Sequence, residues 1–379
     1  MNVLICGAAN VIAIGTARLL LQAGHRAVLA DSNRLARAFH SKYCATKYLF
    51  RDPAVDLAGF EKDLAECLRK ERIALVVPTT DQALLDLVAA RGAIPESVAC
   101  PFPLEADKIR LVLQKGNFAG IGEAAGIRTP RTLRHAEVKG LDPDGLTPPW
   151  VIKRAVGMAG EGLAKVAKRS MLAPILTRTM QRYPGEELLL QEYIDGKVYG
   201  AGGLFDGQGL RRFYCYEYVN RLPRGCGPAT RCLLQRINPV REAFAKVVAA
   251  LDWRGYCQMD FVVDNETLEP CLVDINPVHW YTMPFSASPE LNSLWGYLGD
   301  AQNASAGESM VEPYATVCLS RELQRLLAIV AGHADRPAES LGLFAHARAF
   351  RRSDFYWDPL PILLIPFLRL LDMARKRGK

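Results

Sequence analysis

The sequence predicts an α/β domain with a parallel sheet, followed by an α+β region built largely from hairpins. Short apolar runs alternate with helix-like stretches over roughly the first hundred residues, as in βαβ units. Pro101-Phe102-Pro103 ends this alternation, and strand-like runs follow it as far as Pro277. A chain of 379 residues exceeds what one hydrophobic core usually organises, so we expect two or three domains.

Composition narrows the class of protein. The chain has no uncharged apolar run long enough to span a bilayer and no basic N-terminal leader, so we expect a cytoplasmic protein. Its 10 cysteines are scattered without a CxxC pair, which favours reduced thiols. The net charge of +7 favours anionic ligands such as nucleotides, but no basic block with interleaved aromatic residues indicates a nucleic-acid partner. The 6 histidines show no HExxH spacing, so zinc hydrolysis gains no support.

The first domain is expected to resemble a Rossmann sheet. Its expected strands are Val3–Ile5, Ala27–Ala30 and Ala74–Val77, with helices at Val11–Gln22 and Phe60–Lys70. Gly7 and Gly15 do not complete GxGxxG, which disfavours a dinucleotide-dependent oxidoreductase and leaves Asp31 a weak candidate for a ribose ligand. A docking role is favoured for this domain. The strand ends at Gly7, Asp31 and Thr79-Thr80-Asp81 are candidates for contact with a substrate.

A lysine and a glycine-rich hairpin follow the domain boundary. A helix is expected over Ala106–Ala125, a loop over 140–149, strands at Trp150–Lys153, Leu163–Val166, Glu187–Tyr193 and Val198–Phe205, and a helix at Pro239–Leu251. Lys153 ends its strand just before Gly157, Gly160 and Gly162. Glycines let backbone N–H groups approach an anion closely, and a lysine adds a point charge, so this loop suits a phosphate. An ordinary mobile hairpin explains the same residues, as a solvated helix lysine explains Lys115.

An acidic hairpin supplies oxygen ligands. Two apolar runs, 258–264 and 269–277, flank a turn-prone Asp264-Asn265-Glu266-Thr267 segment. Pairing of these runs would set Asp260 beside Asp274 and Asn276, which lie two apart and so share one face of a strand. Mg²⁺ prefers such ligands and is commonly held by one or two carboxylates together with nucleotide phosphates. Solvated carboxylates on a surface hairpin are the alternative.

The order of these parts resembles the ATP-grasp superfamily. Lys115, ahead of Gly126-Ile127-Arg128-Thr129-Pro130, and Lys153 in Val-Ile-Lys fall where the family has its two nucleotide lysines. The resemblance implies that Glu192-Tyr193-Ile194 form the hinge that holds adenine. It also implies that Asp260, Asp274 and Asn276 bind Mg²⁺ or Mn²⁺.

The resemblance also implies an architecture and a reaction. The expected units are a Rossmann-like pre-ATP-grasp domain at 1–104, a two-lobed ATP-grasp domain at 105–300 with a small flap lobe at about 148–195, and a C-terminal extension at 301–379. The implied activity is that of an ADP-forming, carboxylate–amine ligase like carbamoyl phosphate synthetase or biotin carboxylase. ATP would phosphorylate a small-molecule carboxylate, and an amine would attack the acyl phosphate.

Two departures from the family pattern bear on activity. Both acidic metal positions are aspartate, whereas the family usually has glutamate at the second and often at the first. Val278 stands where members commonly carry an arginine. Arg221 and Arg231 could supply a cation from a neighbouring segment, and His279 could donate a hydrogen bond; we treat these three as catalytic candidates. Structural surface arginines are the alternative. A non-catalytic, nucleotide-sensing member of the family therefore stays open.

The C-terminal extension combines an apolar run, Ile362–Leu371, with a basic end at Arg375–Lys379. A helix packed on the body of the protein is the favoured interpretation. A peripheral contact with an anionic membrane or with a protein partner is the alternative. The sequence also leaves a homodimer open.

Overall fold

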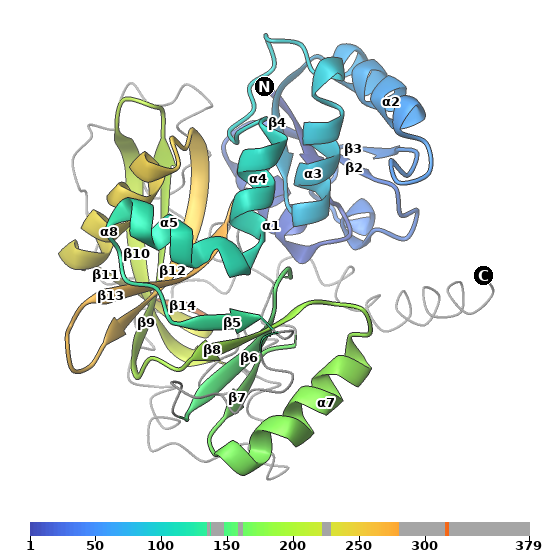
Figure 1. Cartoon of the computed structure of the whole chain (residues 1–379). Coiled ribbons are helices and arrows are strands. Elements are labelled where there is room, and N and C mark those ends of the chain that lie inside the picture. Colours follow the sequence, from blue (N-terminus) through green and yellow to red (C-terminus); the bar gives the residue numbers. More distant parts are fainter. Residues whose placement is uncertain (135–136, 138–147, 158–161, 222–228, 280–314, 318–379) are drawn as a thin grey trace.

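The structure is a computed structural model that describes residues 1–134, 137, 148–157, 162–221, 229–279 and 315–317. These residues form three sheets, each with its own helices (Figure 1). Of the expected C-terminal extension at 301–379, only residues 315–317 are described. The helix, membrane and partner interpretations of its tail concern residues outside the described part of the chain. None of the helices in the described ranges combines the length and apolar character that crossing a bilayer requires.

The N-terminal sheet is parallel, as the alternating pattern predicts. Its strands run in the order β3-β2-β1-β4. The strands are β1 (Asn2–Cys6), β2 (Arg26–Asp31), β3 (Thr46–Leu49) and β4 (Ile73–Pro78), and the helices are α1 (Val11–Gln22), α2 (Leu57–Lys70) and α3 (Asp81–Ala89). Asn10, Asp56 and Thr80 cap the three helices with side-chain oxygens, each accepting from a backbone N–H of the first turn. Two of these capped helices, α1 and α3, begin close to the carboxyl ends of β1 and β4.

The expected single helix over Ala106–Ala125 is wrong in one respect. The structure has two helices, α4 (Ala106–Leu113) and α5 (Phe118–Ala125), separated by a 3₁₀ turn at Lys115–Asn117. Gln114 has extended backbone angles, φ −90° and ψ 100°, and the backbone N–H of Lys115 donates to Ala155 O at 2.9 Å. A tertiary hydrogen bond thus replaces a helical one, and it holds the backbone of Lys115 beside the end of β6.

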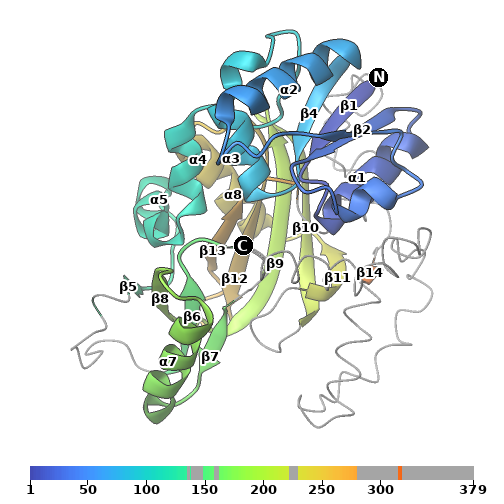
Figure 2. The ribbon, with the colours of Figure 1, turned by 90° about the vertical axis from the view of Figure 1, so that its right-hand side faces the viewer.

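Two antiparallel sheets follow, in the order expected for a two-lobed domain. The smaller sheet, β5-β8-β6-β7, comprises β5 (Thr132–Arg134), β6 (Trp150–Arg154), β7 (Ala164–Val166) and β8 (Leu188–Glu192), with α7 (Leu172–Arg182). The larger sheet, β13-β12-β9-β10-β11-β14, comprises β9 (Gly196–Phe205), β10 (Leu210–Arg221), β11 (Ala229–Gln235), β12 (Gly255–Asp264), β13 (Pro270–Asn276) and β14 (Ala315–Val317), with α8 (Asn238–Ala250). In Figure 2 the small sheet and α7 project below the large one.

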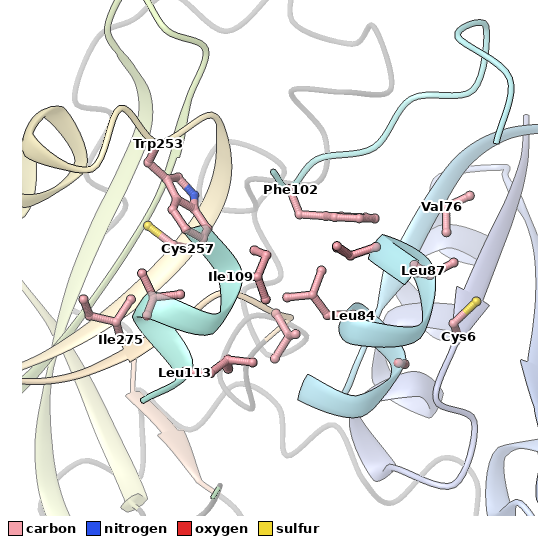
Figure 3. Close-up of a cluster of buried hydrophobic side chains, with 14 of the residues drawn as sticks. Cys6, Val76, Leu84, Leu87, Phe102, Ile109, Leu113, Trp253, Cys257 and Ile275 are labelled. Carbon is pink, nitrogen blue, oxygen red and sulfur yellow. The ribbon is translucent and has the colours of Figure 1, made fainter. Parts of the chain in front are cut away.

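One hydrophobic core crosses the boundary expected near residue 104. Figure 3 shows α4 between the two domains, with Ile109 and Leu113 lying between Leu84 and Leu87 of α3 and the large-sheet residue Ile275. All five side chains are buried. Continuous apolar packing of this kind fixes the N-terminal domain on the large sheet, because interiors are close-packed and resist relative movement.

Candidate functional site

The acidic hairpin forms as the sequence predicts. Strands β12 and β13 pair antiparallel, and the register sets Asp260 directly opposite Asp274 and Gln258 directly opposite Asn276. The register shifts between Asp260 and Phe261, so Val273 is an extra residue in β13. Such bulges re-aim groups beside functional sites. Here the bulge places Val273 between the two paired positions Leu272 and Asp274.

Both predicted lysines reach this hairpin. The Lys115 ammonium donates to Asp274 Oδ1, and the Lys153 ammonium donates to Val273 O at 3.2 Å. Lys115 comes from the break between α4 and α5, and Lys153 comes from β6 of the small sheet. The structure therefore brings together four of the predicted nucleotide and metal residues from three separate parts of the fold.

Burial shifts the charges of this group. Desolvation, with the nearby Lys115 ammonium, lowers the pKa of Lys153 to about 7, although Asp274 opposes the shift. Desolvation and the neighbouring Asp274 raise the pKa of Asp260 to about 6, against hydrogen bonds from Tyr218 and Gln258. Each group is therefore closer to neutral than it would be in water. A polyanion and a cation placed here would restore both charges.

Tyr218 of β10 contacts Asp260 of β12 across the intervening strand β9. Its hydroxyl donates to Asp260 Oδ1 at 2.7 Å. Between the two lies β9, where Gly200 is paired with both Asp260 and Tyr216. A Cβ on Gly200 would stand 2.5 Å from the Tyr216 ring, so only glycine leaves room for the aromatic side chains to lie over this strand. Sequence reasoning missed Tyr218, and its only signal was the run of alternating tyrosines at 214, 216 and 218.

Asp81 also belongs to this group. It is the first residue of α3, at the carboxyl end of β4, where the sequence indicated a substrate contact. Burial raises its pKa to about 6, with smaller opposing effects of Lys115 and Asp274. The N-terminal domain thus contributes a carboxylate that interacts electrostatically with Lys115 and with Asp274 of the acidic hairpin.

The predicted hinge joins the two lobes between β8 and β9. Glu192 Oε2 accepts from Arg131 N at 3.2 Å, and its backbone N–H donates to Arg131 O at 2.8 Å. Tyr193 lies under the Lys165 ammonium, 3.4 Å from the ring centroid. Ile194 is buried against Val198 and Val262. The hinge is held firmly, and its role as an adenine site stays a prediction.

Two of the three predicted phosphate-loop glycines lie in the described residues. Gly157 and Gly162 have φ of +150° and +75°, and a Cβ on either would meet the side chain of Arg154, at 3.1 Å and 2.9 Å. Arg154 in turn lies 4.8 Å from the ring centroid of Tyr183. These glycines therefore have a packing role around Arg154 whatever else they do. Gly160 lies outside the described residues.

The three catalytic candidates come from the β10–β11 pair and from the segment after β13. Arg221 ends β10, and Arg231 in β11 pairs with Asn220 of that same hairpin. His279 is 1% exposed; its Nδ1 is 3.1 Å from Thr16 Oγ1 of α1, and its ring is 4.7 Å from that of Tyr256. Desolvation lowers the pKa of His279 to about 3. The described contacts of this histidine are those of a domain junction, and a catalytic role for all three stays a prediction.

The donor set suits a magnesium ion. Asp260 and Asp274 present carboxylate oxygens on neighbouring strands, and Asn276 follows on the same face as Asp274. The described residues contain no group of three or more His, Cys, Asp or Glu side chains placed to hold a metal, so an amide from Asn276 would have to complete the set. Two carboxylates and an amide match the hard oxygen donors that Mg²⁺ prefers when nucleotide phosphates and water complete its shell.

Comparisons with known proteins match the central part of the chain to one family. Residues 118–278 match the family model described as "ATP-grasp domain". The carbamoyl phosphate synthase large chain of Thermoanaerobacter pseudethanolicus is 22% identical over 184 residues, which are 47% of this chain and 16% of that relative. The chain therefore spans about a sixth of the curated relative that it matches.

Solved structures share the fold. The N5-carboxyaminoimidazole synthetase of Staphylococcus aureus, solved in complex with ADP, superposes with a TM-score of 0.63 at 15% identity, covering 88% of this chain and 86% of that chain. The L-amino acid ligase of Bacillus licheniformis gives a TM-score of 0.55 at 14% identity, covering 73% of this chain and 66% of that chain. At these identities the likeness establishes the fold.

Proposed function

Because this chain belongs to the ATP-grasp superfamily, we propose that it is an ADP-forming ligase that joins a carboxylate to an amine through an acyl phosphate. The observation that carries the proposal is the convergence of Lys115 and Lys153 on β13 beside Asp274. Two ammonium groups and facing carboxylates are what a metal-bound triphosphate requires.

Each lysine has a distinct task in this proposal. Lys115 forms an ion pair with Asp274, and its ammonium would turn to a phosphate oxygen when a metal takes the carboxylate. Lys153 is 6% exposed, so its ammonium is poorly hydrated and would gain strongly from a phosphate. The two charges would neutralise the phosphates without covalent chemistry by the protein.

Asp260, Asp274 and Asn276 would hold Mg²⁺ through oxygen atoms. When bound, the ion would neutralise charge on the phosphate oxygens. The small sheet brings Lys153 to the same hairpin through β6. Closure of this lobe would exclude water from a hydrolysable acyl phosphate. The substrate pair stays a matter for assay, since a fold does not identify substrates.

The proposal is tested by ADP release from the full chain, with Mg²⁺ and panels of small carboxylates and amines. Asp260→Asn together with Asp274→Asn should lower substrate-dependent ADP release by roughly 100-fold or more, since several kcal/mol of charge stabilisation would be lost. Asp107→Asn, an exposed carboxylate on α4, is the matched control and should behave like the wild type. Undiminished turnover in the double variant would refute the assignment.

A second candidate function is nucleotide sensing without turnover. It is favoured by the segment after Asn276, where Val278 is buried and His279 packs against α1, so this part of the chain presents no cation at the position where the family commonly has arginine. Tight binding of ADP with no ADP release under any substrate pair would support this alternative.

A further inference from the structure

Gln258 joins the two types of predicted metal ligand. It lies in β12, two residues before Asp260 and directly opposite Asn276 of β13, so its side chain shares their face of the hairpin. It is 2% exposed, and a buried amide must find partners for both its ends. Those partners are the two neighbouring ligands.

The contacts of Gln258 use its amide in one orientation. Its Oε1 accepts from Asn276 Nδ2 at 2.5 Å, while its Nε2 donates to Asp260 Oδ1 and, at 3.0 Å, to Met259 O. Because the nitrogen of Asn276 is engaged by Gln258, the oxygen of that amide is the end left for a cation. An amide nitrogen cannot bind a metal ion, so this orientation decides whether Asn276 is a ligand.

Asp260 is oriented in the same way. Tyr218 Oη and Gln258 Nε2 both donate to Oδ1, and the contacts in the described part of the chain leave Oδ2 to a cation. Both donors are neutral groups, so they fix the carboxylate without supplying the positive charge that would compete with a metal. Resting on the proposed function, we propose that Gln258, with Tyr218, is a positioning residue that turns the oxygens of Asp260 and Asn276 toward Mg²⁺.

The test measures metal binding separately from turnover. Free Mn²⁺ is titrated into the full chain with saturating ADP and followed by electron paramagnetic resonance, and ADP affinity is measured by calorimetry in excess EDTA. Gln258→Met, which keeps the length of the side chain but removes its hydrogen bonds to Asp260, Asn276 and Met259 O, should weaken Mn²⁺ binding by roughly 10-fold to 100-fold. Its ADP affinity in EDTA should stay close to that of the wild type.

Tyr218→Phe provides a second variant that removes one oxygen atom and keeps the ring, so it remains informative if Gln258→Met folds poorly. It should also weaken Mn²⁺ binding. The matched control is Tyr48→Phe, which removes an equal 2.7 Å hydrogen bond from tyrosine to carboxylate, here to Glu71 in the N-terminal domain. The control should lose stability without losing Mn²⁺ affinity.

The outcomes separate the two proposals. Wild-type Mn²⁺ affinity in folded Gln258→Met and in Tyr218→Phe would overturn the positioning role and leave the ligase proposal standing. Equal losses in Tyr48→Phe and Tyr218→Phe would also overturn it, because they would show a general effect of stability. A wild-type chain that binds ADP but never Mn²⁺ would overturn the proposed function and this inference with it.

Discussion

Lys153 shows at the scale of one residue how a binding site is built at the expense of stability. Burial removes water from its ammonium, which donates to the carbonyl of Val273, a neutral acceptor. Its ring neighbour, Phe118, lies 5.7 Å from Nζ and adds a weak attraction. A buried ammonium with so few polar partners among the described residues is suited to bind an anion.

The lowered pKa of Lys153 makes the stability of the protein depend on pH. Between pH 7 and about pH 10 the unfolded chain keeps a proton on Lys153 that the folded chain has released, so the stability of the wild type should rise with pH across this window. Lys153→Met should remove that rise and be more stable at pH 7 by on the order of a few kcal/mol, at about 1.4 kcal/mol per pKa unit. Urea unfolding at several pH values measures both effects.

Lys47→Met, the same exchange at an exposed position of β3, is the control and should leave the pH dependence of stability as it is in the wild type. Lys153→Met should also lose ADP affinity. Parallel curves of stability against pH for the wild type and Lys153→Met would contradict the prediction.

At the scale of the element, the site depends on a glycine in β9, which leaves room for side chains of the two neighbouring strands. Gly200 of β9 lies between Asp260 of β12 and Tyr216 of β10. Tyr216 stacks on Tyr218 with ring centroids 5.6 Å apart. A change at Gly200 would therefore be transmitted through the stacked rings to the hydroxyl that orients Asp260.

Gly200→Ala should destabilise the protein by roughly 1–3 kcal/mol, since the added Cβ would lie 2.5 Å from ring atoms of a buried tyrosine. It should also weaken binding of Mn²⁺ in the presence of ADP. Gly120→Ala in α5 is the control, because nothing lies within 4 Å of its Cβ, and it should be stabilising by about 0.5–1 kcal/mol. Thermal unfolding distinguishes the two, and equal melting temperatures would count against the proposed role of Gly200.

At the scale of the whole molecule, the N-terminal domain is part of the site. Its core is continuous with that of the large sheet, and Asp81 lies close enough to Lys115 and Asp274 to share their electrostatics. The Thr16–His279 contact joins α1 to the end of the acidic hairpin. The domain therefore does more than dock, because it contacts the segment after the hairpin and adds the Asp81 carboxylate to the surroundings of Lys115 and Asp274.

The pH dependence of this junction can be measured. His279 is buried neutral, so below pH 6.5 the unfolded state takes up a proton that the folded state refuses, and acid should destabilise the wild type through this residue. His279→Phe should remove a contribution of about 2 kcal/mol at pH 5. The difference in unfolding free energy between the wild type and the variant separates the contribution of His279 from that of the carboxylates with raised pKa values. A difference that does not change between pH 7 and pH 5 would contradict the argument.

Local patterns in the sequence determined the alternating first domain, the acidic hairpin and the positions of both lysines, because periodicity and residue type act over a few neighbours. Asp260 and Asp274 face each other because pairing of one short hairpin suffices to place them. Tertiary structure alone decided three other features. These are the break in the predicted helix at Lys115, the bulge at Val273 and the hydrogen bond that Tyr218 makes to Asp260 across Gly200. Each depends on a hydrogen bond or a close approach between segments distant along the chain, and no local preference encodes such a contact.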